Sequence, residues 1–171
     1  MKLNIGAGWP GGRYRAKEWI NLDLVRNQRM TVQGDALFLP FKTDTLEEVH
    51  CCHMLEHLTR EKYPKVLQEI NRVLQPGKKA YIEVPDFHGT IEILHSVFNM
   101  GDPGLIHNWT TSLFGKSENP GMAHHWAFYD KLLIQAMEDA GFKEVYRSNK
   151  LEDMISTHYR HDIILLVIGT K

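Results

Sequence analysis

Short apolar runs alternate along the chain with longer stretches whose apolar residues recur at helical spacing. Runs with strand character cover residues 3–5, 19–24, 30–32, 48–52 and 79–84, and two more follow at 144–147 and 162–168. The last run is apolar at every position after Asp162, as expected for a strand that is buried on both faces. The pattern therefore predicts a sheet built mainly from parallel strands.

Two stretches are predicted to be helices. Residues 63–77 have apolar side chains at helical spacing, with Pro64 suited to a first turn and Pro76-Gly77 suited to a stop. Residues 128–142 repeat the pattern and reach Gly141, which suits a C-cap. Strands that alternate with helices predict an α/β protein, and without a linker or repeat we expect one domain over residues 1–171.

The connections between the first three strands are short, at residues 9–18 and 25–29. Parallel strands usually need a crossover of a dozen or more residues. We therefore expect truncated helices after strands one and two and a thinly covered sheet face. A second copy of the chain could cover that face, so a homo-oligomer is a possible partner state.

The composition excludes several classes of function. The 171 residues include 20 basic and 21 acidic side chains, for a net charge of −1, which leaves no overall electrostatic footprint for nucleic acid. No stretch approaches the roughly 20 apolar residues of a membrane span. The two cysteines, Cys51 and Cys52, are adjacent, and a disulfide between neighbours is strained, so we expect reduced thiols and a cytoplasmic protein.

A glycine-rich loop follows the first strand. Its sequence, Gly6-Ala7-Gly8-Trp9-Pro10-Gly11, fits G-x-G-x-x-G and suits either a dinucleotide or an adenosyl group. Asp23, at the end of the second strand, can accept hydrogen bonds from ribose hydroxyls in both cases. Pro10 removes one N–H, and the segment after it is too short for a full helix, which disfavours pyrophosphate.

A further acidic residue follows the third strand, in the sequence GDALFLPF at residues 34–41. The carboxylate of Asp35 can accept a hydrogen bond from an adenine amino group. The backbone of Ala36 can serve the ring nitrogens, and Leu37 can pack on the ring face. These roles favour an adenosyl group over other ligands.

Two further segments follow the motifs above in order, LEEVHCCHMLEHL and EINRVLQPGKKAYIEVP. On this ordered set of motifs, the chain resembles class I S-adenosylmethionine-dependent methyltransferases of the small, type-11-like subgroup. The resemblance implies a Rossmann-like, seven-stranded, mostly parallel sheet with an antiparallel last strand. It also implies S-adenosyl-L-methionine as cofactor, bound at the ends of strands one, two, three and four. The expected cofactor-binding residues are Gly6, Ala7, Gly8, Asp23, Leu24, Asp35, Ala36, Leu37, Cys52 and His53.

The acceptor wall is expected in residues 87–127, a stretch that we interpret as a loop-rich insertion at the carboxyl edge of the sheet. It contains several histidine and tryptophan residues and two Gly/Pro turn clusters, at 101–104 and 118–121. This composition and the neutral net charge favour a small-molecule acceptor, with an oxygen of a sugar, glycan precursor or secondary metabolite as the methylated atom. Trp109 and Trp126 could equally be packing anchors.

Histidines provide the candidate catalytic groups, because a hydroxyl acceptor must lose its proton. We single out His57, His124 and His125 as candidate general bases. The spacing His53-x-x-Glu56-His57, completed by a later histidine, could also hold zinc or another transition metal. Local hydrogen bonding explains the same spacing, and we assign no metal.

Two other functions fit parts of the sequence. The glycine loop and Asp23 are compatible with an NAD-dependent oxidoreductase, although 171 residues leave little room for a substrate domain. The short first helices are compatible with a non-catalytic, cofactor-binding subunit of a larger assembly. Methyl transfer remains the interpretation that accounts for the whole ordered set of motifs.

Overall fold

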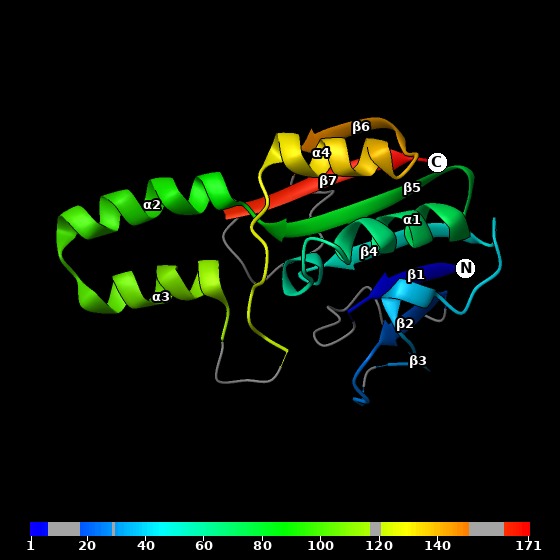
Figure 1. The fold of residues 1–171 in the computed structure, drawn as a ribbon, viewed down its shortest axis with the longest axis horizontal. Helices are drawn as coiled ribbons and strands as arrows, with labels where there is room; N and C mark the ends of the chain where they lie inside the picture. The colour runs from blue at the N-terminus through cyan, green and yellow to red at the C-terminus, as the bar shows by residue number, and fades with distance from the viewer. Residues whose placement is uncertain (7–17, 29, 117–120, 151–162) are drawn as a thin grey trace.

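The computed structural model describes residues 1–6, 18–28, 30–116, 121–150 and 163–171 (Figure 1). Seven strands form one sheet in the order β3-β2-β1-β4-β5-β7-β6. The first five are parallel where they pair, and β7 is antiparallel to both of its neighbours. Their bounds are β1 (Lys2–Ile5), β2 (Trp19–Asp23), β3 (Val32–Gln33), β4 (Leu46–Cys52), β5 (Leu74–Pro85), β6 (Lys143–Ser148) and β7 (Ile164–Thr170). The predicted fold class is confirmed, and the third strand is shorter and later than expected.

One face of the sheet is covered by α1 (Tyr63–Val73) and α4 (Asp130–Asp139) (Figure 1). Alternate strand residues such as Leu3, Val49 and Ile82 are fully buried in the core beneath these helices. This arrangement follows from the period-two alternation of strands and the apolar stripe of each helix. The core therefore lies between the sheet and these two helices.

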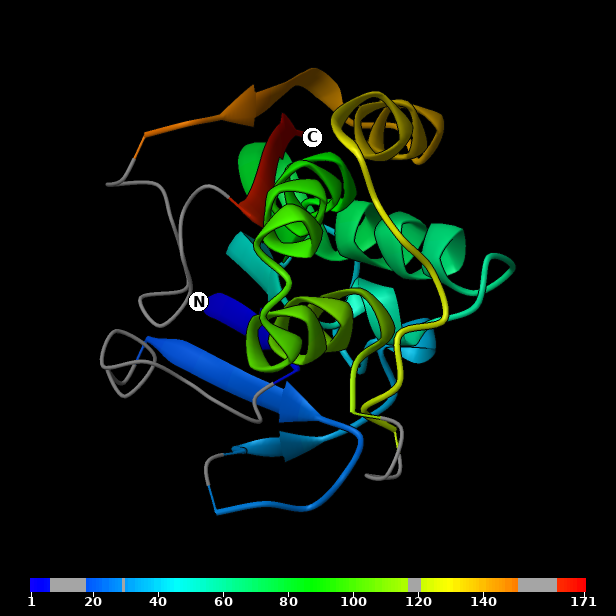
Figure 2. The same ribbon diagram turned by 90° about the vertical axis from the view of Figure 1, so that its left-hand side faces the viewer.

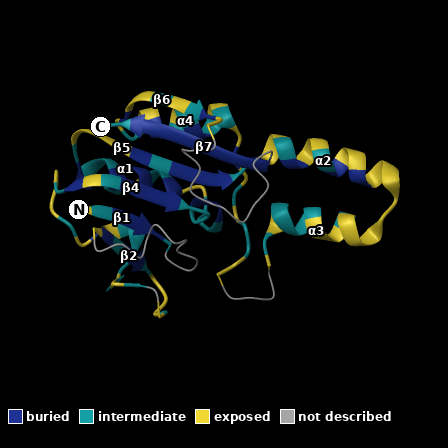
Figure 3. Ribbon diagram, turned by 180° about the vertical axis from the view of Figure 1, so that it is seen from behind, coloured by how far each residue is buried: buried dark blue, intermediate teal, exposed yellow. Residues whose placement is uncertain are grey.

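Side chains on the other face of the sheet are buried as well. Trp19, Ile164, Leu166 and Ile168 form a second apolar cluster, and the ring centroid of His50 lies 4.6 Å from that of Trp19. The dark-blue central strands in Figure 3 show how little of the sheet is exposed. The expectation of a thinly covered face is therefore wrong for these strand residues. The apolar run that predicted a doubly buried strand is confirmed in β7.

Both predicted helices form, and two of the three expected end signals, Pro64 and Gly141, lie at helix ends. Pro64 lies in the first turn of α1, and the helix stops at Val73 because Leu74 is already extended and begins β5. Pro76-Gly77 therefore lies in the irregular start of β5 rather than at the helix end. After α4, Gly141 adopts a left-handed φ of +95°, which a side chain would disfavour.

Residues 87–100 and 103–114 are helical, so the prediction of a loop-rich insertion is wrong for them. Helices α2 (Phe87–Met100) and α3 (Pro103–Phe114) form an antiparallel hairpin that extends beyond the sheet (Figure 1) and is seen nearly end-on in Figure 2. Gly101, with φ +69°, ends α2, and Asp102 caps α3 by accepting hydrogen bonds from the N–H groups of Gly104 and Leu105. The turn cluster at 101–104 thus marks two helix ends and not a loop.

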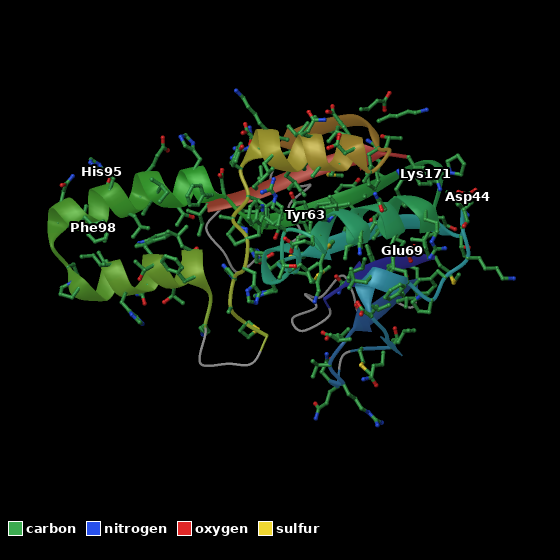
Figure 4. All side chains as sticks on the ribbon, viewed as in Figure 1. Asp44, Tyr63, Glu69, His95, Phe98 and Lys171 are labelled. Atoms are coloured by element: carbon green, nitrogen blue, oxygen red, sulfur yellow. The ribbon has the colours of Figure 1, made fainter. Side chains whose placement is uncertain are left out.

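The hairpin carries large apolar side chains on its surface. Phe98, Met100 and Phe114 are more than half exposed, and α3 has no fully buried residue. Figure 4 labels Phe98 and His95 near the end of the hairpin that is farthest from the sheet. The part of the hairpin nearest the sheet instead contributes to the site described next. Among the described residues, no helix is both long and apolar enough to cross a membrane.

Candidate active site

The carboxyl ends of β1, β2 and β4 meet at one edge of the sheet, where open α/β folds place their ligands. Gly6, directly after β1, has φ +79° and donates its N–H to the Leu22 carbonyl at 3.0 Å. A Cβ at this position would lie 3.1 Å from the Cβ of Met54. Both the conformation and the crowding therefore require glycine. Ala7 and Gly8 lie outside the described residues.

Asp23 ends β2 at this edge, as predicted. Its two carboxylate oxygens accept hydrogen bonds from the Val25 N–H at 2.9 Å and from the Asn27 side-chain amide at 3.1 Å. These contacts fix the turn that follows the strand. Leu24 is 64% exposed, and its carbonyl accepts a hydrogen bond from the Gln33 side chain. The carboxylate thus stands at the strand end in a defined orientation.

Asp35 lies beyond β3 and caps a short 3-10 helix, η2 (Ala36–Phe38). One of its oxygens accepts the Leu37 N–H at 2.9 Å. Ala36 and Leu37 are half-buried and pack against the main core. Asp23 and Asp35 are therefore held at the ends of the paired strands β2 and β3, as the sequence predicts.

A buried polar cluster lies after β4. His53, with φ +49°, has its Nδ1 3.3 Å from Glu56 Oε1 and its Nε2 3.4 Å from Glu83 Oε1. Burial alone would lower the pKa of His53, but the hydrogen bonds and charges of the two carboxylates outweigh it and raise this pKa to about 9. The two carboxylates therefore favour the protonated form of the His53 imidazole.

The thiol of Cys52 belongs to the same cluster and donates to Glu83 Oε1 at 3.2 Å. Burial, together with the charge of Glu83, raises the pKa of Cys52 well above its usual value. Burial also raises the pKa of Cys51, and both thiols are free. Both shifts favour the protonated thiol over the nucleophilic thiolate.

Glu56 lies in the 3-10 helix η3 (Leu55–His57) and is only 2% exposed. Its backbone carbonyl accepts the N–H groups of His125, at 2.8 Å, and Trp126, at 3.3 Å. The ring of Trp126 in turn stacks at 6.3 Å on that of Tyr63, which Figure 4 labels on α1. These contacts hold the segment 123–126 against η3.

The three candidate bases are placed differently. His57 Nδ1 lies 3.0 Å from the Ala123 carbonyl oxygen, His124 Nδ1 lies 3.2 Å from that of Leu113, and the two ring centroids are 5.0 Å apart. Burial lowers the pKa of His124. The His125 side chain is exposed, and its backbone N–H contacts Glu56 by donating to the Glu56 carbonyl. The structure therefore brings His57 and His124 together and leaves the His125 ring outside.

A small pocket opens beside this cluster. It is lined by Glu56, Pro85, Phe87, Ser112, Leu113, His124, Trp126 and Ala127. Within the part of the chain that the structure describes, Glu56 Oε2 and Trp126 Nε1 are buried without a hydrogen-bond partner. Sequence reasoning missed Glu83 altogether, and it named Glu56 without predicting its burial. A glutamate inside the apolar run Tyr81-Ile82-Glu83-Val84 was the available signal for the first.

Comparisons with known proteins agree with the fold. Residues 12–82 match the family model described as a methyltransferase domain, of type 11. No curated protein sequence matches the chain. Solved structures share the fold over 99% of this chain. A SAM-dependent methyltransferase from Archaeoglobus fulgidus has a TM-score of 0.66 at 17% identity over 85% of its length.

Two further structures show the same fold. A putative Haloferax volcanii methyltransferase, solved in complex with the activator Trm112, has a TM-score of 0.63 at 18% identity over 81% of its length. A possible histamine N-methyltransferase from Thermotoga maritima has a TM-score of 0.61 at 20% identity over 81% of its length. At these identities the structures show the fold alone, and the family-model match covers residues 12–82. Residues 12–82 thus resemble the methyltransferase-domain family, and the whole chain has the fold of S-adenosylmethionine-dependent methyltransferases.

Proposed function

We propose that the protein transfers a methyl group from S-adenosylmethionine to an oxygen atom of a small molecule. A hydroxyl group of a sugar, a glycan precursor or a secondary metabolite is the acceptor that we expect. The observation that carries this proposal is the pocket beside β4, where the buried Glu56 Oε2 has no partner among the described residues. A hydroxyl donor would satisfy this oxygen.

The cofactor is proposed to lie across the ends of β1, β2 and β3. Gly6 would leave room for the amino-acid end, Asp23 would accept from the ribose hydroxyls, and Asp35 would accept from the adenine amino group. Proteins of this fold from Burkholderia thailandensis and Haemonchus contortus were solved with S-adenosylhomocysteine or S-adenosylmethionine, at 14% identity to this chain. Cys52 and His53 would then adjoin the sulfonium end.

The chemistry places few demands on the protein. The acceptor oxygen attacks the methyl carbon, a C–O bond forms, and the C–S bond breaks to release S-adenosylhomocysteine. The protein must align the oxygen with that bond and exclude water. The hydroxyl proton must leave as well, and the Nε2 atoms of His57 and His124 are the proposed receivers because a carbonyl oxygen occupies each Nδ1.

The substrate is proposed to be small and not a nucleic acid. The chain has a net charge of −1, so it lacks the overall positive charge that usually holds a phosphate backbone. The free thiols fit a cytoplasmic protein, which stays a prediction. A homo-oligomeric state also stays a prediction, which multi-angle light scattering would measure.

Calorimetry and product analysis test the proposal. We expect S-adenosylhomocysteine to bind, and Asp23→Ala to weaken this binding by about tenfold or more through lost ribose hydrogen bonds. Asp139→Ala, at the end of α4, is the control for removal of a carboxylate. Mass spectrometry of reactions with hydroxylated small molecules should detect O-methyl products. Unchanged affinity in Asp23→Ala would contradict the cofactor placement, and products methylated only on nitrogen would contradict the acceptor class.

A further inference from the structure

Three potential metal ligands from distant parts of the chain converge beside the pocket. A carboxylate oxygen of Glu56 and a ring nitrogen from each of His57 and His124 all lie within 4.8 Å of one another. Glu56 and His57 come from η3, whereas His124 comes from the segment after the α2–α3 hairpin. The hydrogen bonds from His125 and Trp126 to the Glu56 carbonyl hold the two segments in this position.

Both imidazoles are oriented in the way that metal-bound histidines usually are. A carbonyl oxygen can only accept a hydrogen bond, so the Nδ1 atoms facing Ala123 and Leu113 must carry the proton. Each Nε2 then has a lone pair available for coordination. A backbone carbonyl on the far nitrogen is a common second-shell arrangement around metal-bound histidine, because it fixes the tautomer and the ring.

Glu56 supplies an independent observation that points to a ligand. Its side chain is 98% buried, since only 2% is exposed. Oε1 lies 3.3 Å from His53 Nδ1, which fixes the carboxylate, while Oε2 has no partner within the described residues. A buried carboxylate oxygen without a partner is unfavourable, and a bound cation would compensate it.

A neighbouring set of possible ligands, Cys52, His53 and Glu83, is a weaker candidate. Its members already contact one another, because the Cys52 thiol donates to Glu83 and His53 Nε2 lies 3.4 Å from the same carboxylate. His53 therefore has a carboxylate at each ring nitrogen, and its contact with Glu56 Oε1 orients the Glu56 carboxylate. The set Glu56, His57 and His124 therefore differs from the one considered in the sequence analysis, because His53 is not one of its ligands.

We propose that Glu56, His57 and His124 together bind one divalent transition-metal ion, such as Zn²⁺. Two imidazole nitrogens and one carboxylate suit this class of cation and leave a coordination position for an exogenous ligand. Glu56 and His124 also line the pocket. Resting on the proposed function, we infer that the acceptor hydroxyl takes that position, where the ion would favour loss of its proton to solvent. With the ion bound, His57 and His124 would be its ligands and would no longer receive that proton.

Metal binding can be measured without any methyl acceptor. The protein is dialysed against a chelator and titrated with ZnCl₂ by calorimetry, and with CoCl₂ while the visible absorption of Co²⁺ is recorded. We expect one ion per chain. His57→Asn and His124→Asn should each weaken Zn²⁺ binding by at least about 100-fold, because asparagine can still donate to the carbonyl but lacks Nε2.

His95→Asn is the matched control. His95 is exposed on α2, so this substitution removes one histidine without changing Glu56, His57 or His124. Glu56→Gln tests the carboxylate, and the melting temperature of each variant, followed by circular dichroism, identifies any that fail to fold. Zn²⁺ affinity equal to wild type in folded His57→Asn and His124→Asn would overturn the proposal, as would absence of Zn²⁺ binding in the wild type.

The two proposals fail in different ways. S-adenosylhomocysteine binding to the chelator-treated protein reports on the cofactor site alone. If the cofactor product binds and O-methyl products form while no Zn²⁺ binds, the proposed function stands and the metal site is wrong. If Zn²⁺ binds at these residues but only nitrogen atoms are methylated, the metal site stands and the acceptor class is wrong.

Discussion

Arg72 and Glu69, one turn apart on α1, form a two-pronged ion pair. Arg72 Nε lies 2.6 Å from Glu69 Oε1, and Arg72 Nη2 lies 2.7 Å from Glu69 Oε2. The guanidinium also donates to the carbonyls of Phe41 and Leu39, and Glu69 accepts the Leu39 N–H at 2.8 Å. Glu69, labelled in Figure 4, thus helps to anchor the loop that continues from Asp35.

Replacing Arg72 with lysine should loosen this loop. Lysine keeps the charge but cannot reach two carbonyls and both carboxylate oxygens at once. Because the pair is partly exposed, we expect Arg72→Lys to lower the free energy of unfolding by only about 1 kcal/mol. Urea denaturation measures this value. Lys65→Arg, an exposed position on the same helix, should change it by less than about 0.5 kcal/mol. Equal values for both variants would contradict the anchoring role.

The same pair predicts a dependence of stability on pH. The hydrogen bond from Arg72 lowers the pKa of Glu69 in the folded protein. A lowered folded-state pKa stabilises the protein above the unfolded value, which is about 4.3, and this contribution is lost as pH falls through the folded value. Wild type should therefore exceed Glu69→Gln in stability at pH 7, and the difference should shrink below about pH 4. A constant difference from pH 7 to pH 3 in urea titrations would count against this mechanism.

Gly6 should tolerate no side chain. Its φ of +79° disfavours an L-residue, and an added Cβ would crowd Met54. We expect Gly6→Ala to cost about 1–3 kcal/mol of stability and to weaken S-adenosylhomocysteine binding. Gly77→Ala is the matched control, because Gly77 has φ +75° but open space around it. If the two alanine variants lose equal stability, backbone strain alone accounts for the loss and crowding by Met54 does not.

Asp86 should matter more than an ordinary helix cap. It accepts the His88 N–H at the start of α2, and its other oxygen lies 2.9 Å from Arg147 Nη2 on β6, in a buried position. Asp86→Ala removes the cap and leaves the guanidinium without this carboxylate, so we expect a loss of about 2–4 kcal/mol. Asp102→Ala, at the exposed cap of α3, should cost about 1 kcal/mol. Thermal unfolding of both variants checks the difference, and equal losses would show that the contact with Arg147 adds nothing.

Local patterns were sufficient for much of the sheet and for its helical cover. The uninterrupted apolar run in β7 indicated burial on both faces, and Pro64 and Gly141 marked helix ends because their constraints act within one turn. The hairpin was predicted wrongly because Gly101 and Asp102 carry the same turn chemistry in a loop and at two adjacent helix ends. Only the tertiary structure distinguishes these cases.

The site depends on contacts that local patterns do not encode. His57 and His124 are brought together by backbone contacts to Ala123 and to Glu56. Nothing in the spacing of His124 and His125 indicates which ring faces the cluster. Burial of Glu56 likewise follows from packing of a distant segment against η3. The positions of Asp23 and Asp35 at one edge of the sheet could be predicted, because the carboxyl ends of parallel strands share an edge.

The position of β7 has a consequence for biosynthesis. This strand inserts between β5 and β6, and β6 pairs with no other strand among the described residues. While a ribosome is still translating residues 164–170, β6 has no neighbour to join and β5 has an open edge. A nascent chain stalled before this point would therefore present two unpaired edges to chaperones and to other chains.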